Sequence, residues 1–462
     1  MQENKMGVMP VKQLIVTMSV PMMLSMLVQA LYNVVDSIFV ARLGPEGVTA
    51  LSLAFPLQMM IISVSGGTGV GINALLSKSL GEKKFDAANR AACNGIFLAF
   101  CSFLVFLLIG IFVTKPFIGS QLTGLAEGGT QDVALIQRYS EEYLGIVLIL
   151  SLGLFFQVTN ERLLQSTGRT VYSMISQATG AIINIIFDPI MIFGLFGFPR
   201  MEVAGAAYAT VLGQFIAAIL GTIFNIKYNQ DITITMKGIT HPDGDTIRRI
   251  YKVGIPSILM MSIGSVMTFF MNKILLVFSA TADTIFGIYF KLQSFFFMPV
   301  FGLNNGVIPI LAYNYGAQKK ARIKEALQFA IVLAFAITVT GLVVFEVAPQ
   351  MLLGFFNPTE EMLFIGVPAL RIIAIYFPFA GISIILSSVF QAFSESQYSL
   401  MNSIARQLVI LLPAAWLLAR LGNVGYVWWA FPIAEILSMF ITIVFFKKVY
   451  NKIVTPMPDE VS

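Results

Sequence analysis

The chain has 462 residues, of which 57% are hydrophobic and only 11% are charged, and its mean hydropathy is +0.83. This composition excludes an ordinary water-soluble domain and indicates an all-α polytopic membrane protein. The net charge of +5 is accounted for by basic loops that meet anionic lipid headgroups, so it implies no nucleic-acid partner.

Twelve hydrophobic stretches reach the roughly 20 residues that a helix needs to cross a bilayer. The first has full spanning length and lacks a small-residue cleavage site, so we expect it to remain as a membrane helix and not to be removed as a signal peptide. The predicted helices lie near residues 14–40, 50–76, 92–114, 139–164, 171–193, 204–226, 251–277, 285–312, 326–347, 367–392, 400–419 and 427–446.

The distribution of Lys and Arg predicts the orientation of these helices, because basic residues accumulate in cytoplasmic loops. With the N-terminus inside, 21 of the 29 Lys and Arg residues fall in cytoplasmic segments and six fall at the outer ends. Lys273 and Lys291 fall within helices. We therefore expect a multi-pass protein of the cytoplasmic (inner) cell membrane with both termini in the cytoplasm, acting as a monomer among membrane lipids.

The second half of the chain repeats the first. A shift of 235 residues aligns 15–100 with 250–335 without a gap, and matches Pro21 with Pro256, Gln58 with Gln293 and Gly81 with Gly316. Six helices per copy is an even number, so the two copies run in parallel. We expect an N-terminal lobe (1–226, helices 1–6), a cytoplasmic linker (227–250) and a C-terminal lobe (251–462, helices 7–12, with a short cytoplasmic tail), the lobes facing a central cleft.

Two repeated loops, SKSLGEKKFDAANRA and AYNYGAQKKARIKEA, combine a Gly with basic residues. Each pattern predicts a helix end, a Gly turn and a short amphipathic helix at the headgroups. Phosphate binding is a weaker alternative, because neither loop has the spacing of a Walker motif.

Two acids lie inside predicted membrane helices. Asp36 is in the first helix, and Asp188 is in the fifth, four residues after Asn184 and therefore on the same helical face. Burying a charge at such a position costs several kcal/mol, and such charges are kept mainly where they have a function. The pattern therefore suggests a cation or proton site. The alternatives are that Asp36 snorkels outward or pairs with a lysine, and that Asp188, which precedes Pro189, binds backbone groups freed at a kink.

Several motifs together resemble one transporter family. They are the proline-containing first helix that ends in YNVVDSIFVARLG, the SKSLGEKK loop with its YGAQKK copy, NIIFDPIMIFG in the fifth helix and VAGAAYAT at the start of the sixth. Over essentially the whole chain they resemble the multidrug and toxic compound extrusion (MATE) transporters, and most closely the bacterial MepA-like and DinF-like branch. The resemblance implies drug efflux coupled to inward movement of H+ or Na+, without a cofactor.

The resemblance also implies a set of coupling residues in the first lobe. They are Asp36, Gln29, Asn184, Asp188, Thr210 and the nearby backbone of Ala206. If the coupling ion is Na+ and not H+, Asp36, Asn184, Asp188 and Thr210 are its candidate ligands. Some family members place acids in helices 7 and 10, but this chain has apolar or small residues around Gly264 and Ala380, which argues against coupling through the second lobe. At about 1.5 Å per residue, Asp36, Asp188 and Thr210 fall in the same outer half of the first lobe.

Other polar residues are candidates for the cavity or the substrate. In NERLLQSTG, Asn160 and Glu161 occupy a place where the family branch often has an asparagine; the alternative is that Glu161 is a solvated glutamate paired with Arg162 or Arg169. Glu435, a lone acid about eight residues into the twelfth helix, is a candidate for attracting a cationic substrate. The remaining candidates are Gln58, Gln293 and Tyr289.

The sequence allows three placements of the Lys273 and Lys291 side chains. They snorkel toward the outer headgroups, pair with Glu435 or Asp283, or face the first-lobe acids across the cleft. Met and Phe residues of helices 7 and 8 form either a deformable surface for varied drugs or a face toward lipid and core.

We interpret the chain as a secondary active exporter of organic, preferentially cationic and amphipathic, small molecules, working by alternating access. The main alternative is a flippase for lipid-linked precursors, which requires several cations for phosphate where this chain offers only Lys273 and Lys291. A membrane enzyme is disfavoured, because the sequence contains no HExxH or GxSxG motif. A channel is less consistent with the duplication and the buried acids.

Overall fold

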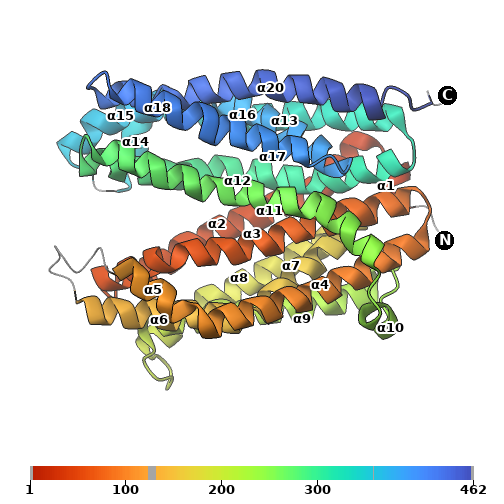
Figure 1. Cartoon of the computed structure of the whole chain (residues 1–462), viewed down its shortest axis with the longest axis horizontal. Helices are drawn as coiled ribbons and strands as arrows, with labels where there is room; N and C mark the ends of the chain where they lie inside the picture. The colour runs from red at the N-terminus through yellow and green to blue at the C-terminus, as the bar shows by residue number, and fades with distance from the viewer. Residues whose placement is uncertain (1–3, 123–131, 357, 459–462) are drawn as a thin grey trace. The chain divides into compact units, whose positions relative to one another are not determined.

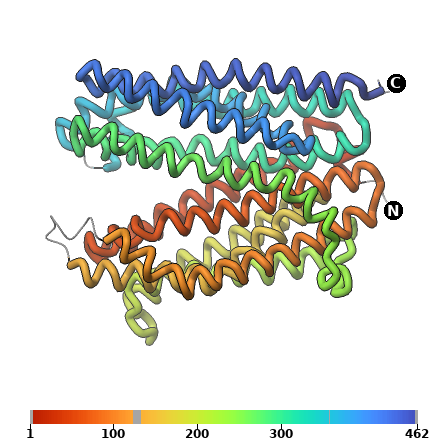
Figure 2. The backbone as a smooth tube through the Cα atoms, viewed as in Figure 1, coloured from red at the N-terminus to blue at the C-terminus, as the bar shows by residue number. Residues whose placement is uncertain are grey.

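The computed structural model describes residues 4–122, 132–356 and 358–458 (Figures 1 and 2), which form helices joined by short turns and contain no β-strand. Ten segments are long and apolar enough to cross a membrane. They are α2 (Val11–Ala41), α3 (Pro45–Gly81), α4 (Phe85–Phe112), α8 (Thr170–Phe193), α9 (Glu202–Tyr228), α11 (Gly244–Leu276), α12 (Ala280–Gly316), α13 (Lys320–Val347), Gln397–Ala419 and Val424–Ile453.

Two more spans are bent helix pairs. Helix α6 (Val133–Ile149) meets α7 (Leu152–Ser166) at 48°, and α15 (Glu360–Ala374) meets α16 (Phe377–Ala392) at 45°. With each pair taken as one span, the described residues contain the twelve membrane helices that the sequence predicts. The two bent pairs are the fourth and tenth spans, which are equivalent positions in the two repeats.

Two of the spans are themselves composite, and four short helices lie outside the spans. The segment Gln397–Ala419 consists of α17 (Gln397–Ile404), a π-helix η1 (Ala405–Leu411) and α18 (Leu412–Ala419), and the last span consists of α19 (Val424–Val427) and α20 (Ala430–Ile453). The short helices are α1 (Lys5–Val8), α5 (Thr114–Leu122), α10 (Met236–Thr240) and α14 (Pro349–Gly354).

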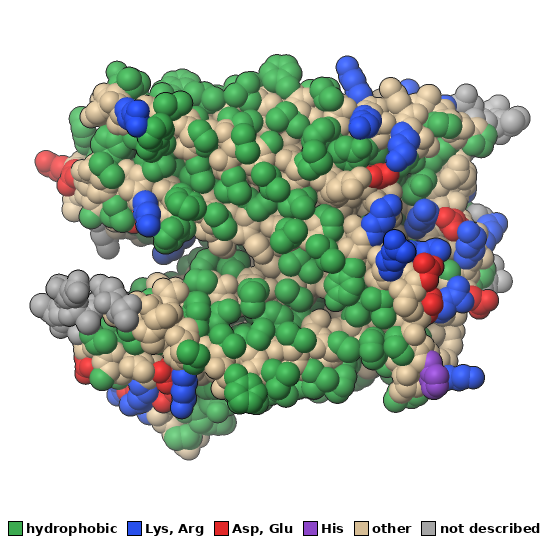
Figure 3. All heavy atoms as spheres, viewed as in Figure 1, with side chains coloured by type: hydrophobic (Ala, Val, Ile, Leu, Met, Phe, Trp, Pro, Cys, Tyr) green, Lys and Arg blue, Asp and Glu red, His purple; other side chains and the backbone are tan. Residues whose placement is uncertain are grey.

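The surface of the helices is apolar where a membrane would cover it. Hydrophobic side chains lie over the middle of the helices in Figure 3, and charged side chains gather toward their ends. Leu108, Val332 and Phe440 are 55%, 62% and 64% exposed. Large apolar side chains at such exposure are typical of contact with lipid tails.

Packing divides the chain into two compact units. The first, here called the C-terminal unit, comprises Met1–Met26, Ser77–Lys84 and Lys252–Ser462; the second, the N-terminal unit, comprises Leu27–Leu76 and Phe85–Tyr251. The predicted linker packs within the N-terminal unit, where Asn94 accepts a hydrogen bond from the Asp243 backbone at 2.9 Å. The lobe boundaries that the sequence analysis places at residues 226 and 251 stay a prediction.

Both ends of the described chain meet the turn between α12 and α13 in the C-terminal unit. Lys319 donates to the Gly7 carbonyl at 2.8 Å, and Lys320 donates to the Thr455 carbonyl at 3.4 Å. Arg322 donates to the carbonyls of Met6 and Met9 at 3.0 and 2.8 Å. The two ends therefore lie on the same side of this unit.

The repeated loops differ from the expectation in one respect. Each consists of a helix end and a tight turn, with Lys83 and Gln318, which are equivalent in the repeat, both at positive φ (58° and 57°). No separate amphipathic helix follows in either described loop, because α4 and α13 begin at Phe85 and Lys320 and continue for 28 residues each. The prediction of a short surface helix was wrong, since each turn leads directly into a membrane span. Lys83 and Lys84 lie in the turn before α4, and Lys320 and Arg322 lie in the first turn of α13.

Candidate functional site

Asp36 and Asp188 meet in the N-terminal unit. The carboxyl group of Asp36 on α2 is hydrogen-bonded to that of Asp188 on α8. Asp36 is 9% exposed and Asp188 is fully buried. Two carboxylates this close cannot both remain ionised without a bound cation, because like charges repel strongly where water is excluded. The pair therefore provides a place for one proton or one small cation.

Asn184 and Thr210 complete one side of this pair. The Asn184 amide nitrogen lies 3.4 Å from Asp188 Oδ1 and 3.0 Å from Thr210 Oγ1, and donates to both. Asn184 and Thr210 are 3% and 5% exposed. The structure thus brings together four of the six residues that the family resemblance implied.

Two glycines allow α8 and α9 to approach closely enough for this contact. A Cβ on Gly180 would lie 2.8 Å from the carbonyl oxygen of Gly213, and a Cβ on Gly213 would meet the carbonyl oxygen of Gly180. Small residues at such crossings let membrane helices pack backbone to backbone. Asn184 is one turn from Gly180, so the close crossing brings its amide to Thr210.

Two tyrosines that the sequence analysis did not select also belong to the site. The Tyr32 hydroxyl is hydrogen-bonded to Thr210, and Tyr32 lies close enough to Asp36 and Asp188 to interact electrostatically with both. Tyr143 on α6 lies near the same acids and accepts a hydrogen bond from Gln58 at 3.2 Å. Tyr32 precedes Asp36 by four residues, so helical spacing could have found it. Tyr143 gave no local signal, because it comes from another span.

Gln29 and Ala206 are the other two residues that the family resemblance implied. Gln29 accepts a hydrogen bond from Gln177 at 3.1 Å. It is seven residues from Asp36, which is about 10 Å along the helix. Ala206 is fully buried, one turn before Thr210. The structure therefore places Gln29 in a separate contact between α2 and α8.

Asn160 and Glu161 are buried near the end of α7. Asn160 donates to Thr222 at 2.9 Å and accepts from Asn225 at 3.1 Å, which ties α7 to α9. Glu161 is 7% exposed and accepts from Gln157 at 2.9 Å. The alternative of a solvated glutamate was wrong, because packing covers this end of the helix.

The C-terminal unit repeats part of this arrangement without its acids. Gln293 donates to the Tyr376 hydroxyl at 2.9 Å, as Gln58 does to Tyr143, and Tyr376 is also hydrogen-bonded to the buried Tyr289 at 2.6 Å. The offset of the repeat shortens along the chain from 235 to 226, where Gln165 and Tyr172 match Gln391 and Tyr398, and then to 220, where Gly205 matches Gly425. At these offsets the equivalents of Asp36, Asp188 and Thr210 are Met271, Ala414 and Ala430. The two units therefore share a polar scaffold, and only the N-terminal unit adds the carboxyl pair.

Glu435 has an arginine partner. Its carboxylate is 3.3 Å from Arg406 Nη1, with side-chain exposures of 5% and 27%. Arg406 lies in the π-helix η1, a geometry often found at functional positions. The prediction that Glu435 is a lone acid or pairs with Lys273 or Lys291 was wrong. Its partner is Arg406, which lies 29 residues earlier in the chain on another helix.

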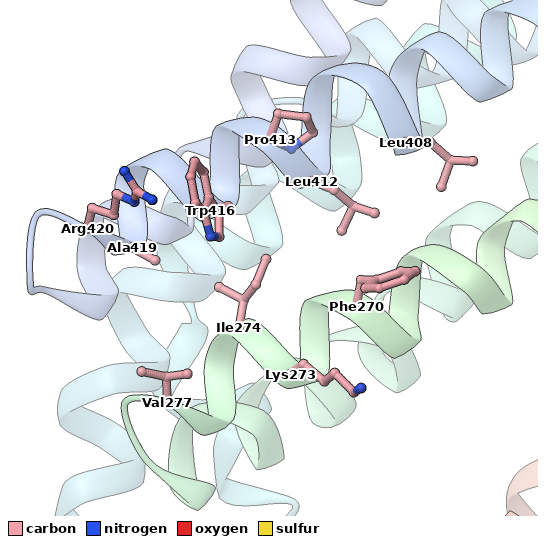
Figure 4. A pocket seen from close by; sticks show the side chains of 10 residues that line it. All are labelled: Phe270, Lys273, Ile274, Val277, Leu408, Leu412, Pro413, Trp416, Ala419 and Arg420. Carbon is pink, nitrogen blue, oxygen red and sulfur yellow. The ribbon is translucent and has the colours of Figure 1, made fainter.

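The two membrane lysines are exposed. Lys273 Nζ lies 4.6 Å from the centre of the Phe269 ring and lines a groove between α11 and α18 (Figure 4). Lys291 is exposed on α12. Phe269 and Phe270 are also exposed, at 55% and 47%, whereas Met271 and Tyr289 are fully buried, so the Met and Phe residues of these helices do not form one continuous surface.

Twelve candidate spans, a duplicated architecture and a buried carboxyl pair define a membrane transporter. The MatE family model matches residues 21–190 and 256–417. The multidrug export proteins MepA of Staphylococcus haemolyticus (strain JCSC1435) and Staphylococcus aureus (strain MSSA476) are each 26% identical, over 436 and 430 residues; these cover 94% and 92% of this chain, and 93% and 91% of the relatives.

Solved structures show the same fold. An outward-facing multidrug resistance MATE family transporter of the MOP superfamily superposes with a TM-score of 0.89, and a MOP superfamily transporter from Pyrococcus furiosus Vc1 (DSM3638) with 0.85. Both are 24% identical and cover 98% of this chain and 99% of their own. The chain belongs to the MatE family, which confirms the resemblance seen in its motifs.

Proposed function

We propose that this protein is a secondary active multidrug exporter that moves organic, preferentially cationic and amphipathic, molecules out of the cell in exchange for H+. The observation that carries the proposal is the hydrogen-bonded Asp36–Asp188 pair, buried in one unit and absent from the equivalent positions of the other. The staphylococcal relatives are multidrug export proteins, which supports the same class of substrate.

A proton fits the pair better than Na+. Asn184 presents its amide nitrogen to both Asp188 and Thr210, so this side of the site offers donors rather than the oxygen ligands that Na+ prefers. Na+ coupling requires the amide to turn its oxygen inward. A proton requires no such change, because it bridges the two carboxyl groups directly.

The charge of the pair provides the coupling. When one proton is bound, the Asp36–Asp188 pair carries a single negative charge. When the proton leaves, both side chains are ionised and repel each other in a site that excludes water. Asn184, Thr210 and Tyr32 link α8, α9 and α2 around this pair, so a change in its protonation acts on the packing of three helices. Alternating access follows if the two protonation states favour different packings.

Transport by purified protein in proteoliposomes tests the proposal. Uphill movement of an organic cation under a pH gradient, with none under a Na+ gradient alone, supports proton-coupled export. Uphill movement driven only by a Na+ gradient would identify Na+, and not H+, as the coupling ion. Only downhill movement contradicts an active exporter and favours a channel, and movement of a lipid-linked precursor but of no organic cation favours the flippase.

We also propose that the protein lies in the cytoplasmic membrane as a monomer with both termini inside. The basic residues of the predicted cytoplasmic loops support this orientation. The contacts of Gly7 and Thr455 with the α12–α13 turn support a common side for the two ends. Cysteines introduced one at a time at Met9 and Thr455, in a chain whose Cys93 and Cys101 are replaced by serine, are labelled from each side of sealed vesicles to test the orientation.

A further inference from the structure

A groove of about 710 Å³ lies between α11 and the composite eleventh span (Figure 4). All of its lining residues belong to the C-terminal unit. There are ten of them, among which are Phe270, Lys273, Leu408, Leu412, Trp416 and Arg420. Eight of the ten are apolar, the other two are cations, and none of these described residues is acidic.

The two cations lie at the ends of their helices. Lys273 is in the last turn of α11, which ends at Leu276, and Arg420 directly follows α18, which ends at Ala419. The seventh and eleventh spans run in the same direction, so both ends reach the same side of the membrane. The aromatic ring of Trp416, 49% exposed beside Arg420, is typical of the level of the lipid headgroups.

Both cations remain available to an anion. Arg420 stacks with its guanidinium carbon 3.7 Å from the centre of the Trp416 ring, which orients the group and leaves its N–H edges open. Lys273 lies over the Phe269 ring. Within the part of the chain that the structure describes, neither cation has a carboxylate partner, and guanidinium and ammonium groups bind phosphate by charge-assisted hydrogen bonds.

We propose that this groove, here called the α11–α18 groove, binds an anionic phospholipid of the surrounding leaflet. One acyl chain lies along the apolar floor formed by Leu408, Leu412 and Phe270. Lys273 and Arg420 attract the phosphate and the net negative charge of the headgroup. The lining is complementary to this ligand, because Phe270, Leu408 and Leu412 lie deeper along their helices than the two cations, which lie at the helix ends. A drug cation is disfavoured by the same two charges. The site is separate from the carboxyl pair and does not depend on the proposed transport.

Native mass spectrometry of the purified full chain tests the proposal, with phosphatidylglycerol or phosphatidylcholine added at equal acyl composition. We expect phosphatidylglycerol to bind more tightly than phosphatidylcholine. Lys273→Gln and Arg420→Gln should each lower the affinity for phosphatidylglycerol about fivefold, because a basic residue at the membrane surface contributes about 1 kcal/mol to the binding of an anionic lipid. Lys115→Gln is the matched control, because Lys115 is an exposed lysine that follows the end of the third span, which runs in the same direction, and does not line the groove.

A second variant tests the apolar half. Leu412→Trp fills the groove without changing its charge, so we expect it to lower phosphatidylglycerol binding, whereas excess inorganic phosphate should not displace the lipid from the wild type. Circular dichroism and the melting temperature show that each variant is folded. Equal binding of the two lipids, equal loss with Lys115→Gln, or unchanged binding by Leu412→Trp would each overturn the proposal.

Discussion

Gly81 and Gly316, which are equivalent in the two repeats, each pack against the loop of the other repeat. A Cβ on Gly81 would collide with the carbonyl oxygen of Tyr313, and a Cβ on Gly316 would collide with that of Lys78. Lys78 and Tyr313 are themselves equivalent at the offset of 235 residues. The contact within the C-terminal unit is therefore reciprocal, and the absence of a side chain at both glycines allows the two turns to meet.

We expect Gly81→Ala and Gly316→Ala each to lower the stability of the protein by about 1–3 kcal/mol, because a methyl group there meets backbone that cannot rotate away. The melting temperature in detergent measures the effect. Gly287→Ala is the matched control in the same unit, since nothing lies within 4 Å of its Cβ position. That substitution should be neutral or stabilising by up to about 1 kcal/mol. Equal melting temperatures for all three variants would show that the turns separate without cost.

Asp36→Asn and Asp188→Asn should each abolish transport driven by a pH gradient. Either substitution removes one of the two carboxyl groups that share the proton, while the amide keeps the size of the side chain and the possibility of a hydrogen bond. Membrane insertion and melting temperature should stay close to those of the wild type. Asp283→Asn, in the first turn of α12, is the control acid in the other unit. Gradient-driven transport by either folded mutant would remove that acid from the mechanism.

Tyr32→Phe should reduce pH-driven transport by up to about tenfold without changing the fold. The substitution removes only the hydroxyl that bonds to Thr210, and a net hydrogen bond contributes about 0.5–1.5 kcal/mol, which corresponds to about a factor of two to ten. Tyr208→Phe serves as the control, because Tyr208 is on α9, the helix of Thr210, in the same unit but is 40% exposed. Initial rates in proteoliposomes provide the measurement, and equal rates for the two variants contradict a role for the Tyr32 hydroxyl.

Glu435→Gln should destabilise the protein by about 2 kcal/mol, because Arg406 then loses its charged partner in a largely buried position. The double variant Arg406→Met with Glu435→Leu should recover much of this loss, since neither charge is left behind. Melting temperatures of Arg406→Met, Glu435→Leu, the double variant and the wild type form a complete cycle. Additive losses would show that the pair does not interact.

The same Glu435 variant tests the predicted role in substrate selection. If Glu435 attracts cationic substrates despite its arginine partner, export of a cationic compound falls more than export of a matched neutral one. Rates must be normalised to the amount of folded protein, because the variant is expected to be less stable. An equal fall for both compounds assigns Glu435 a purely structural role.

The sequence alone determined the membrane class, the twelve spans, the duplication and the positions of the two acids. These features depend on hydrophobic length, on a repeat offset and on rare charged residues in apolar surroundings, all of which are local or periodic. Helical spacing also placed Asn184 beside Asp188, and the same rule would have identified Tyr32 from Asp36. The family motifs led to Thr210, which lies on another helix.

Only the tertiary structure decided which polar groups on different helices meet. The bends between α6 and α7 and between α15 and α16 lie inside continuous apolar stretches, so hydropathy gave no sign of them. The partners Tyr143 for Gln58 and Arg406 for Glu435 come from separate spans, at 85 and 29 residues' distance. In a membrane protein the lipid-facing and core-facing sides of a helix are both apolar, so periodicity does not reveal how helices are rotated, and packing alone selects these contacts.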